Sequence, residues 1–187
     1  MEIGKKGRQP LRFPPGEQPD HWNPNPESPD HRFALGRVLT PTRSQNPLVV
    51  IAMNPSYADH SESDKTVNTV IAASSMLGHD GWIMLNLYPE RATNSRHLRD
   101  FDASLWAQNW TAIEQVLDTF GVSEVLGAWG NPQHRTIRQA KTSMLAALTA
   151  RGASVYYFGD PTAQGNPRHP TPRGTPWNVI GDKSYVL

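Results

Sequence analysis

The fold class of this chain is decided by the stretch LVVIAMNPS at residues 48–56, an unbroken apolar run that stops at a polar turn containing proline. An apolar run of this length is typical of a strand that is buried on both faces, as in a parallel sheet. Runs of the same kind recur at residues 82–87, 124–129 and 153–158. The sequence therefore predicts a sheet built from four buried strands.

Helical patterns separate these four runs. Between residues 104 and 120, for example, apolar side chains follow the three-and-four spacing of a buried helix face. The first pattern follows Asp64, and suitable N-cap side chains stand near the starts of the other two, at Ser104 and Asn131. A glycine ends each pattern, in chain order Gly78, Gly121 and Gly152. Because such crossovers are right-handed, we expect an α/β fold, a three-layer α/β/α sandwich with a central, mostly parallel four-stranded sheet.

Many of the 17 prolines lie between Pro10 and Pro47, before the first apolar run. We expect residues 1–31 to form a proline-rich N-terminal arm, either extended over the domain or partly disordered, because its apolar surface is too small to offset the entropy lost on ordering. Residues 32–39 are expected to contain a short edge strand. A chain of 187 residues suits one domain, so residues 32–187 are predicted to form a single α/β domain.

Composition excludes several classes of site. The chain has no cysteine, which rules out disulfides, thiolate catalysis and cysteine-ligated metals. No histidine pair has the spacing of metal ligands, so we expect neither a metal nor a cofactor. No segment is apolar enough to span a bilayer, and we expect a cytoplasmic protein. The net charge of +1 gives no general attraction to nucleic acid, so DNA binding would need a local basic surface.

Each predicted strand is followed by a polar segment, at residues 54–59, 88–93, 130–135 and 159–174. Ligands of α/β proteins bind beyond the carboxyl ends of parallel strands, so these segments are expected to share one edge of the sheet. The last segment is the longest, and long loops in compact domains are often functional. Since it carries His169, we predict that Asn54 and His169 meet in a common cleft.

Two motifs resemble those of the uracil-DNA glycosylase superfamily, in particular its single-strand-selective monofunctional branch. They are Met53-Asn54-Pro55-Ser56 and His169-Pro170-Thr171-Pro172-Arg173, with Asn86 and Ala128-Trp129-Gly130 in matching order between them. The chain is also identified as a member of the DUF1643 family of bacteria and phages by four motifs, at residues 54–59, 86–93, 128–130 and 167–170.

The glycosylase resemblance implies a role for each catalytic candidate. His169 would donate a hydrogen bond to the departing base, which gains negative charge as the glycosidic bond breaks. Asn54 would orient the attacking water. Since an amide cannot deprotonate water, Asp59 in the same loop is the alternate base. Asn86 would read the edge of a flipped pyrimidine through its amide, and Tyr57 or Tyr88 would stack on that base.

The resemblance also implies a wider binding site, with one departure from the pattern. Ser56 stands where the glycosylase branch has glycine, so the pocket is expected to be narrower or differently polar, and the base need not be uracil. Arg91 is expected to pair with a carboxylate or a phosphate. The predicted substrate-binding residues are Met53, Pro55, Ser56, Tyr57, Asn86, Tyr88, Arg91, Pro170 and Thr171. The predicted DNA-binding residues are Arg168, Arg173 and Lys183.

Each candidate has a purely structural alternative. The Asn54 motif is also typical of a turn, Asn86 of a turn cap, and His169 of a loop side chain bonded to a carbonyl. Trp106, Trp110 and Trp129 fit a buried face, whereas Arg135, Arg138 and Lys141 form either a solvated face or a phosphate-contacting stripe.

Two functions follow from these candidates. The first is a monofunctional glycosylase that removes a modified pyrimidine from DNA, single- or double-stranded, in phage defence or DNA modification. The second is a non-catalytic module that binds a base or nucleic acid within such a system.

Overall fold

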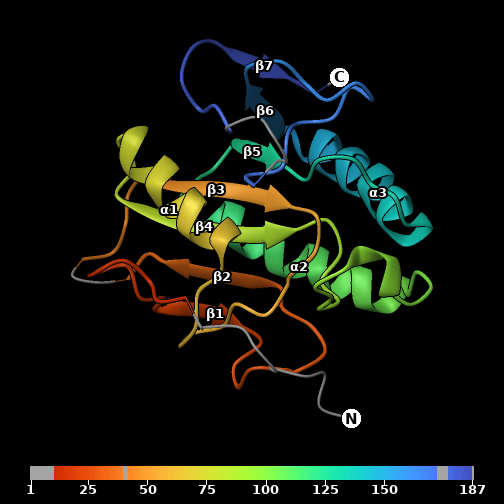
Figure 1. Cartoon of the computed structure of the whole chain (residues 1–187), viewed down its shortest axis with the longest axis horizontal. Helices are drawn as coiled ribbons and strands as arrows, with labels where there is room; N and C mark the ends of the chain where they lie inside the picture. Colours follow the sequence, from red (N-terminus) through yellow and green to blue (C-terminus); the bar gives the residue numbers. More distant parts are fainter. Residues whose placement is uncertain (1–10, 40–41, 172–176, 187) are drawn as a thin grey trace.

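The structure, a computed structural model, describes residues 11–39, 42–171 and 177–186. In these residues, seven strands form one sheet in the order β1-β2-β4-β3-β5-β6-β7 (Figure 1). The strands are β1 His21–Asn23, β2 Ala34–Arg37, β3 Pro47–Ala52, β4 Gly81–Asn86, β5 Glu124–Ala128, β6 Ser154–Phe158 and β7 Lys183–Tyr185. The predicted α/β class is confirmed.

The four predicted strands are β3, β4, β5 and β6, and they pair in parallel at the centre of the sheet. The prediction of a four-stranded sheet is wrong, because antiparallel strands extend both sides. β2 lies within residues 32–39 as expected, but it is not an edge strand, since β1 from the N-terminal arm pairs with it. The extra strands β1 and β7 have three residues each, too few to give a periodic pattern.

The helices are α1 Lys65–Met76, α2 Ala103–Phe120 and α3 Arg135–Arg151, with a short 3-10 helix η1 at Ser95–His97. Alternate residues of the central strands enter two separate apolar cores. Val50 and Met84 pack in the core that includes the apolar face of α1, whereas Val49 and Ile83 pack in the core that includes α2 and α3. The helices therefore cover both faces, which makes three layers (Figure 1).

The described part of the N-terminal arm, residues 11–31, packs on the α1 side of the sheet. Leu11 forms a backbone bridge with Ser63, just before α1. Phe13 stacks on Trp82 of β4, and the indole Nε1 of Trp82 donates a hydrogen bond of 2.9 Å to Glu17. Among the residues described, every helix falls short of the length and apolarity that a membrane span requires.

The glycines that end the helices are predicted better than the caps that begin them. Gly121 and Gly152 have φ of 62° and 78°, a conformation that favours glycine, and they cap α2 and α3. At the N-termini, neither predicted cap is correct: Asp102 caps α2 in place of Ser104, and His134 caps α3 in place of Asn131. Asp64 caps α1, and its carboxylate accepts from the Val67 amide.

The N-cap of α2 gives a test of this part of the structure. The Asp102 carboxylate accepts from the amides of Ser104 and Leu105, at 2.8 and 3.0 Å. Asp102→Ala is expected to lower the free energy of unfolding by about 0.5–2 kcal/mol, the cost of losing an N-cap. Ser104→Ala is the matched control and should change it little. Urea denaturation measures both, and a larger loss for Ser104→Ala would contradict the observed helix start.

Candidate functional site

A cavity of about 390 Å³ opens at the carboxyl ends of β3 and β4. Its volume lies in the range of small-molecule sites. Ala52, Met84 and Asn86 line it from the ends of these paired strands. The other lining residues are Arg32, Met53, Asn54, Ser56, Tyr57, Asp64, Lys65, Thr66, Ala92, Thr93, Ser95, His169 and Thr171. The loops after β3, β4 and β6 therefore meet, and the predicted common cleft for Asn54 and His169 is present.

Asn54 joins the loop after β3 to the loop after β4. Its Nδ2 donates to the carbonyls of Ala92 at 2.8 Å, Pro55 at 3.1 Å and Glu90 at 3.5 Å. The Ala92 amide in turn donates to the Pro55 carbonyl. These bonds consume the donor side of the Asn54 amide and leave its Oδ1 as the group that can act on a ligand or water. Pro55 itself is buried and does not line the cavity.

Two arginines, Arg32, which is buried, and Arg91, which is half-buried, hold the same loop through its main chain. Arg91 donates from Nη1 to the carbonyls of Ser56 and Ala58, and Arg32 donates from Nη1 to the same Ala58 carbonyl at 2.6 Å. Burial, followed by the neighbouring charge of Arg91, lowers the pKa of Arg32 to about 10. Arg91 was expected to pair with a carboxylate or a phosphate; in the structure its Nε and Nη1 donate to main-chain carbonyls, and the charges of Glu27 and Asp59 act on it without a direct ion pair among the described residues.

Asn86 is the most enclosed polar group of the cavity. Its side chain is 0 % exposed, and neither its Nδ2 nor its Oδ1 has a hydrogen-bond partner. Its main chain is held by the parallel ladder to Ala52 and by Asn109, which donates to the Asn86 carbonyl at 2.9 Å. The alternative role as a turn cap is therefore wrong. A buried amide without partners is costly, and a ligand that offers both a donor and an acceptor would satisfy it.

His169 is held as a neutral ring of one tautomer. The backbone N–H of Thr171 donates to His169 Nδ1 at 3.1 Å, so the ring proton lies on Nε2. Burial lowers the pKa of His169, while the negative charge of Asp64 acts in the opposite direction. The alternative role, a loop histidine bonded to a backbone carbonyl, is not seen, because Nδ1 accepts from a backbone N–H. The Nε2–H is left as a fixed hydrogen-bond donor.

The loop that carries His169 is anchored from β5 and α3. Trp129 and Lys141 both donate to Asn166 Oδ1, at 3.3 and 2.8 Å. The Gly130 amide donates to the Pro167 carbonyl at 2.9 Å. Gly130 has φ of 68°, and a Cβ on it would lie 3.2 Å from the His169 Cβ. The Ala-Trp-Gly motif therefore positions the histidine loop, and Trp129, 1 % exposed, is a core residue as expected.

Several predicted residues lie away from the cavity. Asp59 turns into its own loop, where its carboxylate accepts from the amides of Ser61 and Glu62. Tyr88 is buried in the core on the other face of the sheet, and its hydroxyl accepts from the Asp102 amide. Neither side chain lines the site, so Asp59 is not placed to act as a base and Tyr88 is not placed to stack on a ligand.

The predicted DNA-binding residues are dispersed. Lys183 belongs to β7, where it pairs with Glu124 at 2.6 Å and lies over the Tyr156 ring. Arg168 donates from Nε to the Asp160 carbonyl in its own loop. Arg173 lies outside the described residues. Pro170 is buried beside His169 but is not among the residues that line the cavity.

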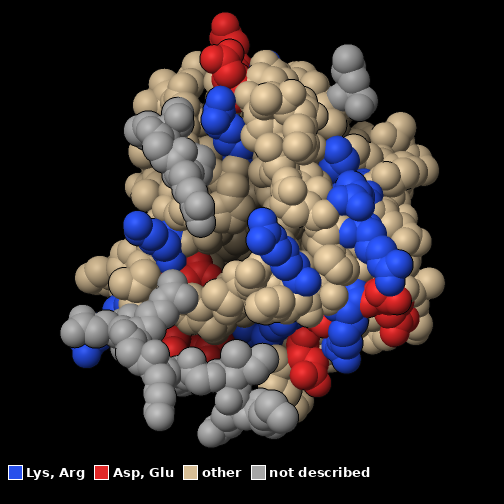
Figure 2. Space-filling view, turned by 45° about the vertical axis from the view of Figure 1, so that its right-hand side comes forward, with Lys and Arg blue, Asp and Glu red and all other residues tan. Residues whose placement is uncertain are grey.

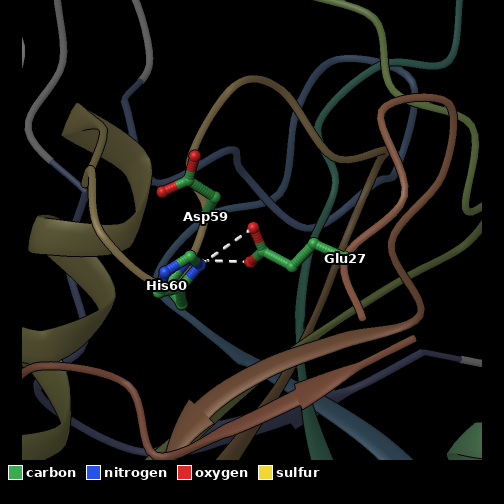
Figure 3. A group of neighbouring side chains, drawn as sticks. All are labelled: Glu27, Asp59 and His60. Atoms are coloured by element: carbon green, nitrogen blue, oxygen red, sulfur yellow. Dashed lines mark hydrogen bonds and ion pairs between the residues drawn. The ribbon is translucent and has the colours of Figure 1, made fainter. Parts of the chain in front are cut away.

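Glu27, Asp59 and His60 form a group whose potential ligand atoms all lie within 4.8 Å of one another (Figure 3). Figure 3 shows Glu27 and His60 facing each other, and their ion pair measures 3.0 Å. The charges of Glu27 and Asp59 also act on both Arg32 and Arg91. The two carboxylates thus balance the guanidinium groups of the buried Arg32 and the half-buried Arg91, which accounts for the cluster without a cation.

Sequence reasoning missed six polar residues of the cavity: Arg32, Asp64, Lys65, Thr66, Thr93 and Ser95. A signal existed for Asp64, Lys65 and Thr66. A helix that joins two parallel strands runs back across the sheet, so its N-terminus starts at the edge where the first strand ends. Arg32 had no such signal, because it precedes the strands that define this edge.

Titration of His169 tests the geometry of the ring. By NMR, the pKa of His169 should lie below the ordinary value of about 6.5. Asp64→Asn should lower it further, because the carboxylate that favours the charged ring is removed. Because folding lowers this pKa, the unfolded chain binds the proton at a higher pH than the folded protein does. The contribution of His169 to the free energy of unfolding is therefore lost as the pH falls from about 6.5 through the pKa of the folded state. A pKa above 6.5 would contradict the assigned environment.

Comparison with known proteins places the chain in a family. A family model described as "Protein of unknown function (DUF1643)" matches residues 32–171, well over half of the chain. Neither the curated proteins nor the solved structures gave a match. The matched range includes Asn54 in the loop after β3, Asn86 at the end of β4 and His169 in the loop after β6. The chain belongs to the DUF1643 family.

Proposed function

We propose that this protein is a DNA glycosylase-like enzyme that hydrolyses the N-glycosidic bond of a modified pyrimidine. One observation carries the proposal: Asn54 and His169 from two loops and Asn86 from the end of β4 line one cavity, in which the Asn86 amide has no partner. To recognise the edge of a base, a protein must offer it both a hydrogen-bond donor and an acceptor. To cleave the bond, it must also offer a donor to the departing base. The cavity supplies these groups together.

The neutral His169 suits the leaving group of this reaction. As the bond between the sugar and the base breaks, negative charge develops on the base oxygens. A preorganised donor in a water-poor site stabilises such charge more strongly than bulk water does. Nε2–H is such a donor, because the Thr171 amide fixes the ring through Nδ1. The uncharged ring also avoids the cost of burying a cation in the cavity wall.

Asn86 and Asn54 divide recognition and water positioning between them. Asn86 offers Nδ2–H and Oδ1 to the edge of a pyrimidine, which matches one donor and one acceptor in the plane of the ring. Asn54 has its Nδ2 bound to carbonyls, so Oδ1 accepts a hydrogen bond from the attacking water. Ser56 and Tyr57 line the same cavity and shape it around substituents of the base.

The surface around the site supports contact with a DNA backbone. Figure 2 shows Lys and Arg side chains around a hollowed region and in a row beside it. Lys65 is exposed where it lines the cavity. Arg138 is exposed near the start of α3, where its Nη1 donates to the Gln133 carbonyl. Arg135 is already paired with Asp100, and Lys141 holds Asn166, so these two contribute less. Phosphate contacts by the remaining cations would make binding weaken with salt.

A second candidate is a non-catalytic module that binds the same base or nucleotide. The observation that favours it is the position of Asp59, which turns away from the cavity and cannot assist Asn54. An amide alone orients water without accepting its proton. A site with recognition groups and no base would bind a flipped nucleotide without cleaving it.

Excision from a panel of oligonucleotides carrying modified pyrimidines tests the enzyme. Released bases are identified by mass under single-turnover conditions. His169→Ala is expected to slow excision by ~10²–10³, or about 2.7–4 kcal/mol, the cost of removing one oxyanion-type donor. The matched control is His97→Ala, since His97 is exposed in η1 and does not line the cavity.

The same panel separates the two candidates. Equal rates for His169→Ala and the unaltered protein would remove this histidine from the mechanism. Retention of a modified oligonucleotide with no abasic product at any excess of protein would favour the binding module. Affinity that does not change with salt would count against DNA as the ligand.

A further inference from the structure

One carboxylic acid lines the cavity among the residues that the structure describes, and it is Asp64. Its side chain is buried, with 6 % exposure. It comes from the N-terminus of α1, ten residues after Asn54 along the chain. The site therefore contains an acid that has no part in the roles proposed above for Asn54, Asn86 and His169.

The carboxylate of Asp64 is fixed on one side and open on the other. Its Oδ1 accepts from the Val67 amide at 2.8 Å, as the N-cap of α1. Among the described residues, no hydrogen bond uses its Oδ2. An N-cap alone needs only one oxygen, and serine or asparagine would serve equally well. A second oxygen that is left available in a ligand-sized cavity can interact with water or substrate.

The charges around Asp64 give the cavity two poles. Burial and the charge of Arg91 lower the pKa of Arg32, whereas the charge of Asp64 raises it. Burial also lowers the pKa of His169, again opposed by Asp64. Arg32 is 3 % exposed and takes part in no ion pair among the described residues. The exposed Lys65 also lines this cavity. Asp64 is thus the negative pole of a site whose other charged groups are cationic.

Cleavage of an N-glycosidic bond needs both poles. The bond from C1′ to the base nitrogen breaks with its electron pair moving to the base, so the base becomes negative and the sugar becomes a cation. A group that stabilises only one of these charges leaves the other uncompensated. His169 and Arg32 suit the base, and a carboxylate suits the sugar.

We propose that Asp64 is the catalytic carboxylate of this site, an inference that rests on the proposed function. Its negative charge stabilises the cationic sugar, and Oδ2 accepts a proton from the water that Asn54 orients. The water oxygen bonds to C1′ as the base departs, which leaves an abasic sugar. The proton on Asp64 then passes through solvent to the anionic base, so the products are neutral and the carboxylate is regenerated.

Asp64→Asn separates this role from helix capping. Asparagine caps a helix as well as aspartate does, so the variant should keep its folding stability while losing the negative charge. Single-turnover excision should fall by about 10²–10⁴, the usual contribution of a positioned general base. Affinity for an oligonucleotide with a non-cleavable 2′-fluoro nucleotide should stay unchanged, because the sugar cation forms only during reaction. Asp64→Ser, a second residue competent to cap, repeats the measurement.

Asp182→Asn is the control, because Asp182 is an exposed acid that does not line the cavity. Its excision rate should equal that of the unaltered protein. If the unaltered protein releases a base and both Asp64 variants release it equally fast, the role of Asp64 is overturned and the glycosylase proposal stands. If the unaltered protein releases no base from any substrate in the panel, both proposals fall.

Discussion

The site depends on the parallel register of β3 and β4, in which Ala52 lies beside Asn86. Parallel strands must end at the same edge, so the two loops that follow start side by side. The pleat then decides which side chains face the cavity, because Met84 and Asn86 are two residues apart and point to the same face. One step of slippage would turn the Asn86 amide into the opposite core.

The loop after β3 is held in place mainly by bonds to its own main chain. Asn54, Arg32 and Arg91 all donate to backbone carbonyls of this loop or of the loop after β4. Arg32 is buried and Arg91 is half-buried, and Glu27 and Asp59 offset the two charges. Such an arrangement costs desolvation, but it fixes the positions of the side chains between the bonds. The carbonyl of Ala58 receives both arginines and is the centre of this arrangement.

The sequence predicted the central strands and the common edge because both leave a strong pattern: continuous apolar runs, and polar segments directly after them. It did not predict β1 and β7, which are too short to be periodic and are recruited by neighbouring strands. The error over Asp59 has a similar cause. The loop turns outward at Asp59, through its bonds to residues 61 and 62, and returns to the edge only where α1 begins. Asp59 is closer than Asp64 to Asn54 in the sequence, but the crossover helix α1 brings Asp64, and not Asp59, to the cavity.

The outermost strand of the sheet, β7, has consequences for the behaviour of the protein in concentrated solution. All three of its residues are exposed, and such an edge can recruit a strand from another molecule. β7 is short, and its Lys183 keeps a charge at this border by pairing with Glu124 on β5. Short charged edges resist strand addition, so this border protects the molecule from forming intermolecular sheets. Lys183, which was expected to contact nucleic acid, thus disfavours the addition of a strand from a second molecule at this edge.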